Sequence, residues 1–217
     1  MKKIAILVDV GFVDRAFKLA PIGRSFSPDS LYDFTRAFVD PNTDDLIRIF
    51  FYHAEPYGEV VKLPVSNNVY DFKTSPQYIN KKNFLSRLAL KDHVAIRRGK
   101  TILSGWILKD SIIQKFQQNP AYTVIDDDYK PNIQQKGVDI KIGLDVAWIS
   151  EHNEIEKIIL ITADSDFVPA MKFARREGVQ IVLGQYKPYI ARLSHDFREH
   201  TDVTRYVDKV NGVWKLV

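Results

Sequence analysis

Residues 158–169, IILITADSDFVP, predict the central strand of the fold and a candidate site at its end. Four consecutive aliphatic residues (158–161) are typical of a parallel strand covered on both faces, because such a strand shows no polar side to water. Asp164 and Asp166 follow directly. In open α/β sheets, ligands bind outside the carboxyl ends of the strands, so this pair is placed to hold a hard cation. The alternative is that both residues cap the helix that follows.

A second aliphatic run at residues 4–8 predicts another buried strand, with Asp9 at its carboxyl end. Gly11 allows a tight turn there, and apolar residues then recur at helical spacing until Pro21. Asp9 is therefore either a helix cap or a reactive carboxylate at the same edge of the sheet as Asp164.

Other patterns alternate between strand and helix, which favours an α/β fold with a largely parallel sheet. Ser27, Pro28 and Asp29 open a helix, and the turn pair Asn211-Gly212 joins two terminal strands. The remaining predictions are strands at 46–52 and 179–184, helices at 78–90, 110–118, 139–149 and 189–197, a hairpin of 93–98 with 101–109 around Gly99-Lys100, and a short strand at 124–125.

With 217 residues the chain fits one domain, 1–217. Residues 54–78 carry repeated Pro, Gly and Asn with no sustained period, and together with the helix and hairpin after them they predict an insertion at 54–109. The terminal strands predict a C-terminal extension at 203–217. What the insertion recognises is left open.

Composition excludes some kinds of site and permits others. The chain has no cysteine, which excludes disulfides, thiolate metal ligands and cysteine nucleophiles. No stretch qualifies as a signal segment or a membrane span, so a cytoplasmic protein without a membrane partner is expected. The net charge of +4 permits a polyanionic partner. If several aspartates gather in one pocket, the remaining surface is more basic than the total net charge indicates. A basic surface around an acidic pocket suits a metal-dependent protein that acts on nucleic acid.

Two further acidic segments are candidates for metal ligands. Asp126, Asp127 and Asp128 occupy a polar stretch with no anchoring strand and are interpreted as solvated. Asp139 is expected in the first turn of a helix, where the helix dipole favours an anion. Asp145, six residues later, points about 120° away from it, so it either reaches the site from the side or bonds neighbouring side chains.

Three segments together resemble the NYN domain family, the PIN-like nuclease group that includes LabA-type proteins. These are ILVDVGF at 6–12, KGVD at 136–139 continuing to Asp145, and LITADSDFVP at 160–169. The first segment departs from the pattern, because Val10 stands where many members have asparagine. In the third, Thr162-Ala163 stands where Ser-Gly is usual.

The resemblance implies a Rossmann-like, PIN-like parallel sheet sandwiched by helices, with an acidic pocket that binds Mg²⁺ or Mn²⁺ and cleaves RNA. Carried across, the catalytic and metal-binding residues would be Asp9, Asp139, Asp164 and Asp166. Asp145 and Ser165 would lie at the pocket margin. Lys136 and Lys141 are candidates for holding the phosphate backbone, or are plain surface lysines.

The function expected from this resemblance is metal-dependent endoribonuclease activity, with single-stranded RNA as the partner and a homodimer among the options for assembly. One alternative is a non-catalytic RNA-binding or regulatory module that keeps the pocket. A haloacid dehalogenase-type phosphatase is disfavoured, because it needs an acid two residues after the first aspartate and Gly11 stands there.

Overall fold

The structure is a computed structural model that describes residues 1–19, 26–119, 121–190 and 192–217. The described chain forms two compact units. The first comprises residues 1–53, 84–99 and 137–217, and the second comprises residues 54–83 and 100–136. The second unit begins where the predicted insertion (54–109) begins, but residues 84–99 belong to the first unit and the second unit extends to Lys136.

The first unit is built on a sheet whose five neighbouring strands run parallel, in the order β9-β8-β7-β1-β2. The buried aliphatic runs predicted at 4–8 and 158–161 form β1 and β7, which are adjacent. The parallel strands are β1 (Lys2–Asp9), β2 (Asp44–Ala54), β7 (Lys157–Ile161), β8 (Gln180–Tyr186) and β9 (Val203–Val210). β10 (Val213–Leu216) pairs antiparallel with β9 through the predicted Asn211-Gly212 turn, in which both residues have positive φ.

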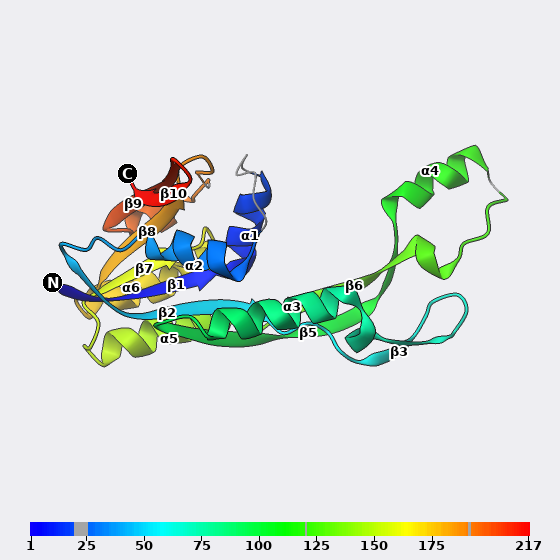
Figure 1. The fold of residues 1–217 in the computed structure, drawn as a ribbon, viewed down its shortest axis with the longest axis horizontal. Helices are drawn as coiled ribbons and strands as arrows, with labels where there is room; N and C mark the ends of the chain where they lie inside the picture. Colours follow the sequence, from blue (N-terminus) through cyan, green and yellow to red (C-terminus); the bar gives the residue numbers. More distant parts are fainter. Residues whose placement is uncertain (20–25, 120, 191) are drawn as a thin grey trace. The chain divides into compact units, whose positions relative to one another are not determined.

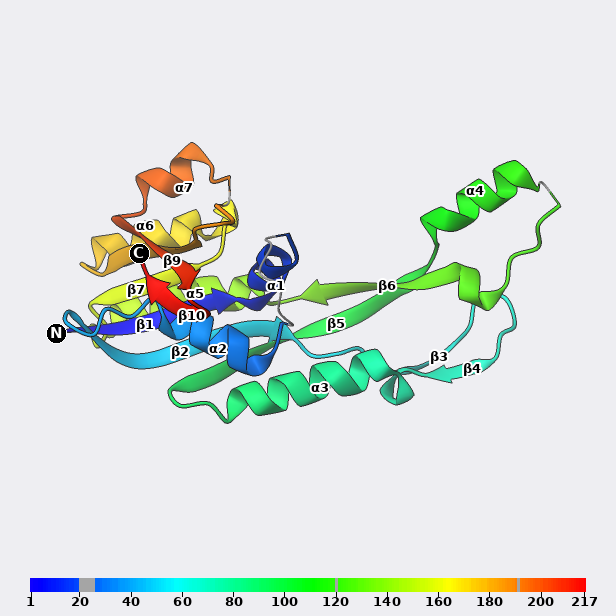
Figure 2. The same ribbon diagram turned by 45° about the horizontal axis from the view of Figure 1, so that its top comes forward.

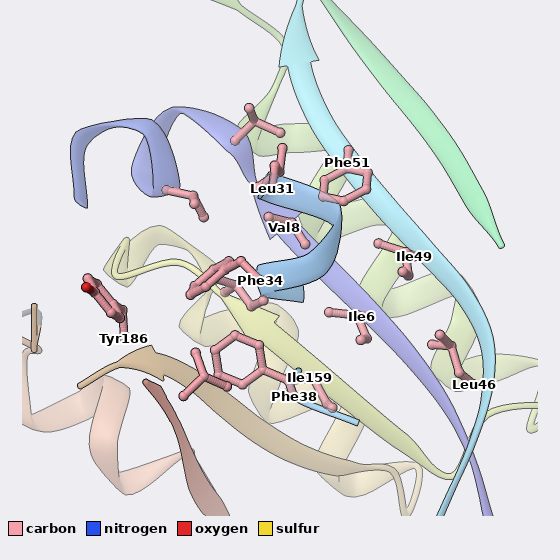
Figure 3. Close-up of a cluster of buried hydrophobic side chains, with 14 of the residues drawn as sticks. Ile6, Val8, Leu31, Phe34, Phe38, Leu46, Ile49, Phe51, Ile159 and Tyr186 are labelled. Carbon is pink, nitrogen blue, oxygen red and sulfur yellow. The ribbon is translucent and has the colours of Figure 1, made fainter. Parts of the chain in front are cut away.

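One face of this sheet is covered by α1 (Val10–Leu19) and α2 (Pro28–Arg36), as Figures 1 and 2 show. Ser27 caps α2 as predicted and forms a capping box with Ser30. Pro21, where the first helix was predicted to stop, lies outside the described residues. The core between these helices and the sheet is rich in aromatic side chains, and Figure 3 shows Leu31, Phe34 and Phe38 packed over Ile6 and Ile159.

The opposite face carries α5 (Asp139–Glu151) and α6 (Val168–Arg176), which pack against each other. A short 3₁₀ turn, η3 (Ser165–Phe167), leads into α6. Both faces of the central strands are therefore covered, which is why β7 is buried along its whole length. The observed fold is the predicted α/β class, a large sheet flanked by helices.

A buried ionic cluster ties the start of β2 to two other strands of the sheet. The Asp44 side chain is fully buried and accepts hydrogen bonds from Lys157 and Arg205. It also accepts from the backbone N–H of Asp40 at 3.0 Å. The carboxylate is thus fully satisfied, as a buried charge must be.

Two elements continue from one unit into the other: α3 (Pro76–Ala89) and β5 (Val94–Leu108). In the second unit, β5 pairs antiparallel with β6 (Tyr129–Lys136), and β3 (Val60–Lys62) pairs with β4 (Val69–Asp71). The same unit holds α4 (Asp110–Gln118) and the 3₁₀ turns η1 (Phe72–Thr74) and η2 (Asp126–Asp128).

Several local predictions were wrong. The hairpin around Gly99-Lys100 is one continuous strand, β5, and the glycine with positive φ in it is Gly105, at a break in the pairing register with β6. Residues 124–125 form no strand. The helix predicted at 189–197 is only α7 (His195–Glu199), capped by Ser194.

The aspartates at 126–128 are also not a solvated run. Asp126 accepts hydrogen bonds from the backbone N–H groups of Val65 and Ser66 at 2.9 and 3.2 Å. Asp128 is buried and accepts from the Tyr122 hydroxyl at 2.8 Å. These two side chains tie loops of the second unit together.

No α-helix among the described ranges is long and apolar enough to cross a membrane.

Candidate functional site

The carboxyl ends of β1 and β7 emerge side by side. The two strands pair in parallel with Val8 opposite Ile161, so Asp9 and the 162–164 segment leave the sheet at the same edge. This is the edge at which open α/β sheets present ligand-binding residues. The two strands therefore bring the predicted residues Asp9 and Asp164 to the same edge of the sheet.

Asp9 is held by the turn that starts α1. Its carboxylate accepts a hydrogen bond from the backbone N–H of Phe12 at 3.1 Å. A side-chain carbon added at Gly11 would lie 3.3 Å from the Asp9 carboxylate oxygen, tighter than an ordinary contact. Glycine at position 11 thus leaves the carboxylate room. The helix-cap interpretation of Asp9 and the site interpretation are compatible, since one oxygen suffices for the cap.

Asp164 caps η3, as the alternative interpretation of the sequence allowed. One carboxylate oxygen accepts from the backbone N–H of Asp166 at 3.0 Å. The Asp164 backbone N–H in turn donates to the Thr162 hydroxyl at 3.3 Å. Asp164 is half-buried, whereas Asp166 and Ser165 are exposed. The cap fixes the Asp164 side chain at the sheet edge and leaves Asp166 open to solvent.

Asp9 and Asp164 line one cavity of about 580 Å³. Two arginines share it with them, Arg15 from α1 and Arg192 from the segment after β8. Sequence reasoning did not find these arginines, because neither belongs to a motif. The residues that line the cavity are Asp9, Phe12, Arg15, Thr162, Ala163, Asp164, Tyr189, Ile190 and Arg192.

Asp139 lies in the first turn of α5, as predicted, and its side chain is exposed. Charge effects on pKa values connect Asp139 with the other three aspartates. Although Asp139 is exposed, neighbouring protein displaces part of the water around its carboxylate and so raises its pKa, and the negative charges of Asp164 and Asp166 raise the pKa further. Asp139 therefore lies within electrostatic reach of both.

Asp9 has a raised pKa for related reasons. Burial is the largest cause, and the charge of Asp139 adds to it, while the Phe12 N–H and the charge of Arg15 act in the opposite direction. The four aspartates thus form one electrostatically coupled group in which negative charges oppose each other.

The four carboxylates do not form a tight cluster. Among the described residues, the one group of three metal-ligating side chains whose ligand atoms all lie within 4.8 Å of one another is Asp196, Glu199 and His200. No three of the four predicted aspartates meet that spacing. The Asp196 group lies on the short helix α7, and Asp196 is paired with Lys172 at 3.3 Å.

Asp145 bonds neighbouring side chains, one of the two outcomes considered from the sequence. Its carboxylate accepts from the Tyr52 hydroxyl and from Nε of Arg97, both at 2.7 Å. Arg97 also lies over the Phe50 ring, 4.8 Å from its centre. Asp145 is therefore part of a polar contact between β2, β5 and α5, with its hydrogen-bonding oxygen already used.

The two lysines proposed for phosphate differ from each other. Nζ of Lys141 donates to the backbone carbonyl of Arg98 at 2.9 Å. Lys136 is exposed at the end of β6 and belongs to the second unit. The structure thus gives Lys141 a backbone partner and assigns Lys136 to the other unit.

Comparison with known proteins gives one family and one similar structure. The NYN domain model matches residues 3–203. A crystal structure of a protein of unknown function from Vibrio parahaemolyticus is similar, with 14% sequence identity, a TM-score of 0.50, and coverage of 98% of this chain and 96% of that one. At that identity the likeness shows the fold alone. No curated protein matches the chain.

Proposed function

The chain belongs to the NYN domain family, and from this premise we propose that it is a metal-dependent endoribonuclease that acts on single-stranded RNA. Its fold is of the PIN-like nuclease type. The observation that carries the proposal is that Asp9 and Asp164 line one cavity at the carboxyl edge of the sheet. Asp139 is near enough for its charge to raise the pKa of Asp9, and the charges of Asp164 and Asp166 raise the pKa of Asp139.

The donor chemistry of this group suits a hard divalent cation. All four side chains offer carboxylate oxygens, which Mg²⁺ and Mn²⁺ prefer. The negative charges that raise the pKa values of Asp9 and Asp139 are offset when a cation binds beside them. Mg²⁺ retains several waters and uses only one or two protein carboxylates directly. No three of the four carboxylates have ligand atoms within 4.8 Å of one another, which fits a cation that some of them hold through water.

In this proposal Asp9 and Asp164 hold the cation directly, and Asp139 holds it directly or through water. A cation bound there would lower the pKa of a coordinated water and neutralise charge on the phosphate. Asp166 is exposed and lies in η3 directly after Asp164, so we assign it to orienting the attacking water or to a further ligand position.

The two arginines that line the cavity supply positive charge for binding the phosphate. A cluster of carboxylates repels a phosphodiester, and positive side chains beside it offset that repulsion. Arg15 and Arg192 line the same cavity as Asp9 and Asp164, and a guanidinium can bind phosphate oxygens in a bidentate manner. We propose these two residues, ahead of Lys136 and Lys141, as the contacts to the scissile phosphate.

Cleavage of a labelled single-stranded RNA in the presence of Mn²⁺ tests the proposal. Asp9→Asn and Asp164→Asn should each lose activity by about 100-fold or more, in line with the loss of a transition-state-stabilising group. Asp110→Asn is the matched control, because Asp110 is a highly exposed carboxylate outside the group. Full activity in both site variants would reject the mechanism.

The alternative function is a non-catalytic RNA-binding module with the same pocket, and the spacing of the four carboxylates favours it. RNA binding without any Mn²⁺-dependent cleavage by the wild-type chain would support this alternative. The cytoplasmic location and the homodimer stay predictions.

A further inference from the structure

The second unit contains a cavity of about 550 Å³ whose lining includes six aromatic residues. Its aromatic lining includes Tyr57, Tyr70, Tyr78, Trp106 and Tyr129, all of them half-buried. A volume of this size is typical of small-molecule sites, which combine apolar walls with a few polar groups. The rings come from several segments of the unit, so folding gathers them from distant parts of the sequence.

Phe72 holds three of these rings in place. It is buried, and it makes edge contacts with Tyr57 and Tyr70 at 5.0 Å between ring centres in each case. Trp106 stacks on it with an angle of 26° between planes. Rings fixed by a shared neighbour lose little conformational freedom when a ligand binds, which favours affinity.

The backbone also approaches the cavity wall closely. A side-chain carbon added at Gly58 would lie 2.7 Å from the Tyr78 ring, closer than such atoms are found. Glycine at position 58 is thus required for the loop to pack against α3 and for Tyr78 to keep its position in the wall.

The cavity offers polar groups along with its rings. Within the described part of the chain, the hydroxyls of Tyr57, Tyr70 and Tyr78 form no hydrogen bond with protein. Gln77 and Asp127 also line the cavity, and they add an amide and a carboxylate. Such groups can recognise the edge of a flat heterocycle while the rings stack on its face.

We propose that this cavity binds an unstacked nucleobase of single-stranded RNA. The inference rests on the proposed ribonuclease function for its choice of partner. Stacking on aromatic side chains is the general way in which proteins hold unpaired bases. Lys81 adds a positive charge to the lining, and the Asp126 carboxylate, which also lines it, is occupied by the N–H groups of Val65 and Ser66.

A proline-rich peptide is the competing ligand, because aromatic grooves also bind polyproline helices. The lining itself carries two carboxylates, Asp126 and Asp127, and one lysine, Lys81, but the charge of the unit as a whole favours the RNA. The second unit has nine lysines against seven acidic residues, so it carries a net positive charge toward a polyanion.

The test measures binding, so that it is independent of cleavage. A fluorescently labelled single-stranded octaribonucleotide is titrated with the full chain in EDTA, and anisotropy is recorded. Trp106→Ala should weaken binding by about 5- to 150-fold, the range of one lost base-stacking contact. Trp148→Ala is the matched control, since Trp148 is an exposed indole of the first unit. It should bind as the wild type does.

Two further variants keep the test decisive if Trp106→Ala does not fold. In the wild type, the bound base should quench the fluorescence of the Trp106 indole. Trp106→Phe should keep most of the affinity and lose this quenching. Tyr78→Ala, on a different element, should weaken binding as Trp106→Ala does. Because the titration is carried out in EDTA, without the divalent cation that cleavage needs, failure of the nuclease proposal leaves this result unaffected.

Three outcomes overturn the inference. In the first, the wild-type chain does not bind the octaribonucleotide. In the second, the wild type and the two alanine variants bind it equally. In the third, a polyproline peptide displaces the RNA, and binding of the peptide depends on Trp106. A Trp106-dependent affinity for RNA, with no affinity for the peptide, supports it.

Discussion

Asp139, in the first turn of α5, lies close enough to Asp9, at the end of β1, for its negative charge to raise the pKa of Asp9. The same residue feels the charges of Asp164 and Asp166. A folded protein keeps mutually repelling carboxylates when something else compensates them, and a bound cation does so.

Replacing Asp9 should stabilise the metal-free protein at neutral pH. The pKa of Asp9 lies above 3.8 in the folded protein, so between that value and the raised pKa the folded state holds more protons than the unfolded chain. Stability from this group is therefore highest at low pH and falls as pH rises through the interval. Asp9→Asn should raise the Tm in EDTA at pH 7 and change it little at pH 4.

Thermal scans of Asp9→Asn and of Asp14→Asn at both pH values check this prediction. Asp14 lies on α1 and pairs with Lys18 at 2.6 Å, so its replacement should give the same small change at both pH values. A lower Tm for Asp9→Asn at pH 7 than for the wild type would contradict the electrostatic account.

Manganese should stabilise the wild-type protein through the four aspartates. A ligand at 100 times its Kd adds about 2.7 kcal/mol to the free energy of unfolding, which is a rise in Tm of roughly 5–10 °C for a chain of this size. EDTA should reverse the shift. Asp9→Asn and Asp164→Asn should show little of it, whereas a shift that survives in both variants would place the bound ion elsewhere.

Asp44→Ala should be strongly destabilising, because it leaves the buried ammonium of Lys157 without its carboxylate. Breaking a buried ion pair from one side costs about 3–5 kcal/mol. Burial raises the pKa of Asp44, but hydrogen bonds from Arg205 and Lys157 lower it by more. The pKa of Asp44 is therefore below its ordinary value. This stabilisation is present above pH 3.8 and is lost as pH falls below it.

Urea unfolding at pH 7 measures the cost for Asp44→Ala, with Asp45→Ala as the control because Asp45 is the exposed neighbour on the same strand. The control should lie within about 0.5 kcal/mol of the wild type. Equal stability of the two variants would show that the buried cluster contributes nothing.

Asp145→Ala should reduce stability without abolishing cleavage. The change leaves the buried Tyr52 hydroxyl without its acceptor, which costs about 1–3 kcal/mol. Because the Asp145 oxygen is used by Tyr52 and Arg97, Mn²⁺-dependent RNA cleavage per folded molecule should stay near the wild-type rate. A double-mutant cycle with Tyr52→Phe measures the coupling, and a loss of cleavage as large as that of Asp164→Asn would assign Asp145 to the site.

The sheet could be predicted where sequence and burial agree over a whole strand. Residues 4–8 and 158–161 are aliphatic at every position because both faces of β1 and β7 are covered. β6 was not predicted, since most of its residues are exposed and polar. The sequence predicts a turn at Gly99, but β5 continues through this residue. Glycine permits turn conformations without imposing them, and Gly99 keeps the extended backbone of a strand.

The candidate site was predictable in part for a similar reason. Asp9 and Asp164 follow strands that a local pattern identifies, and the parallel pairing of β1 with β7 brings their ends together. Arg15 and Arg192 enter the same cavity from segments far apart in the sequence, and no local pattern marks either. The partners of Asp145 likewise come from β2 and β5, so only the folded chain distinguishes a structural carboxylate from a catalytic one.

The anomalous scattering of a crystal soaked in Mn²⁺ shows most directly whether Asp9 and Asp164 hold one cation. We expect a peak at the carboxyl edge of the sheet, at a coordination distance of roughly 2 Å from carboxylate oxygens of both residues. A peak only at Asp196, Glu199 and His200, or none at Asp9 and Asp164, would contradict this expectation.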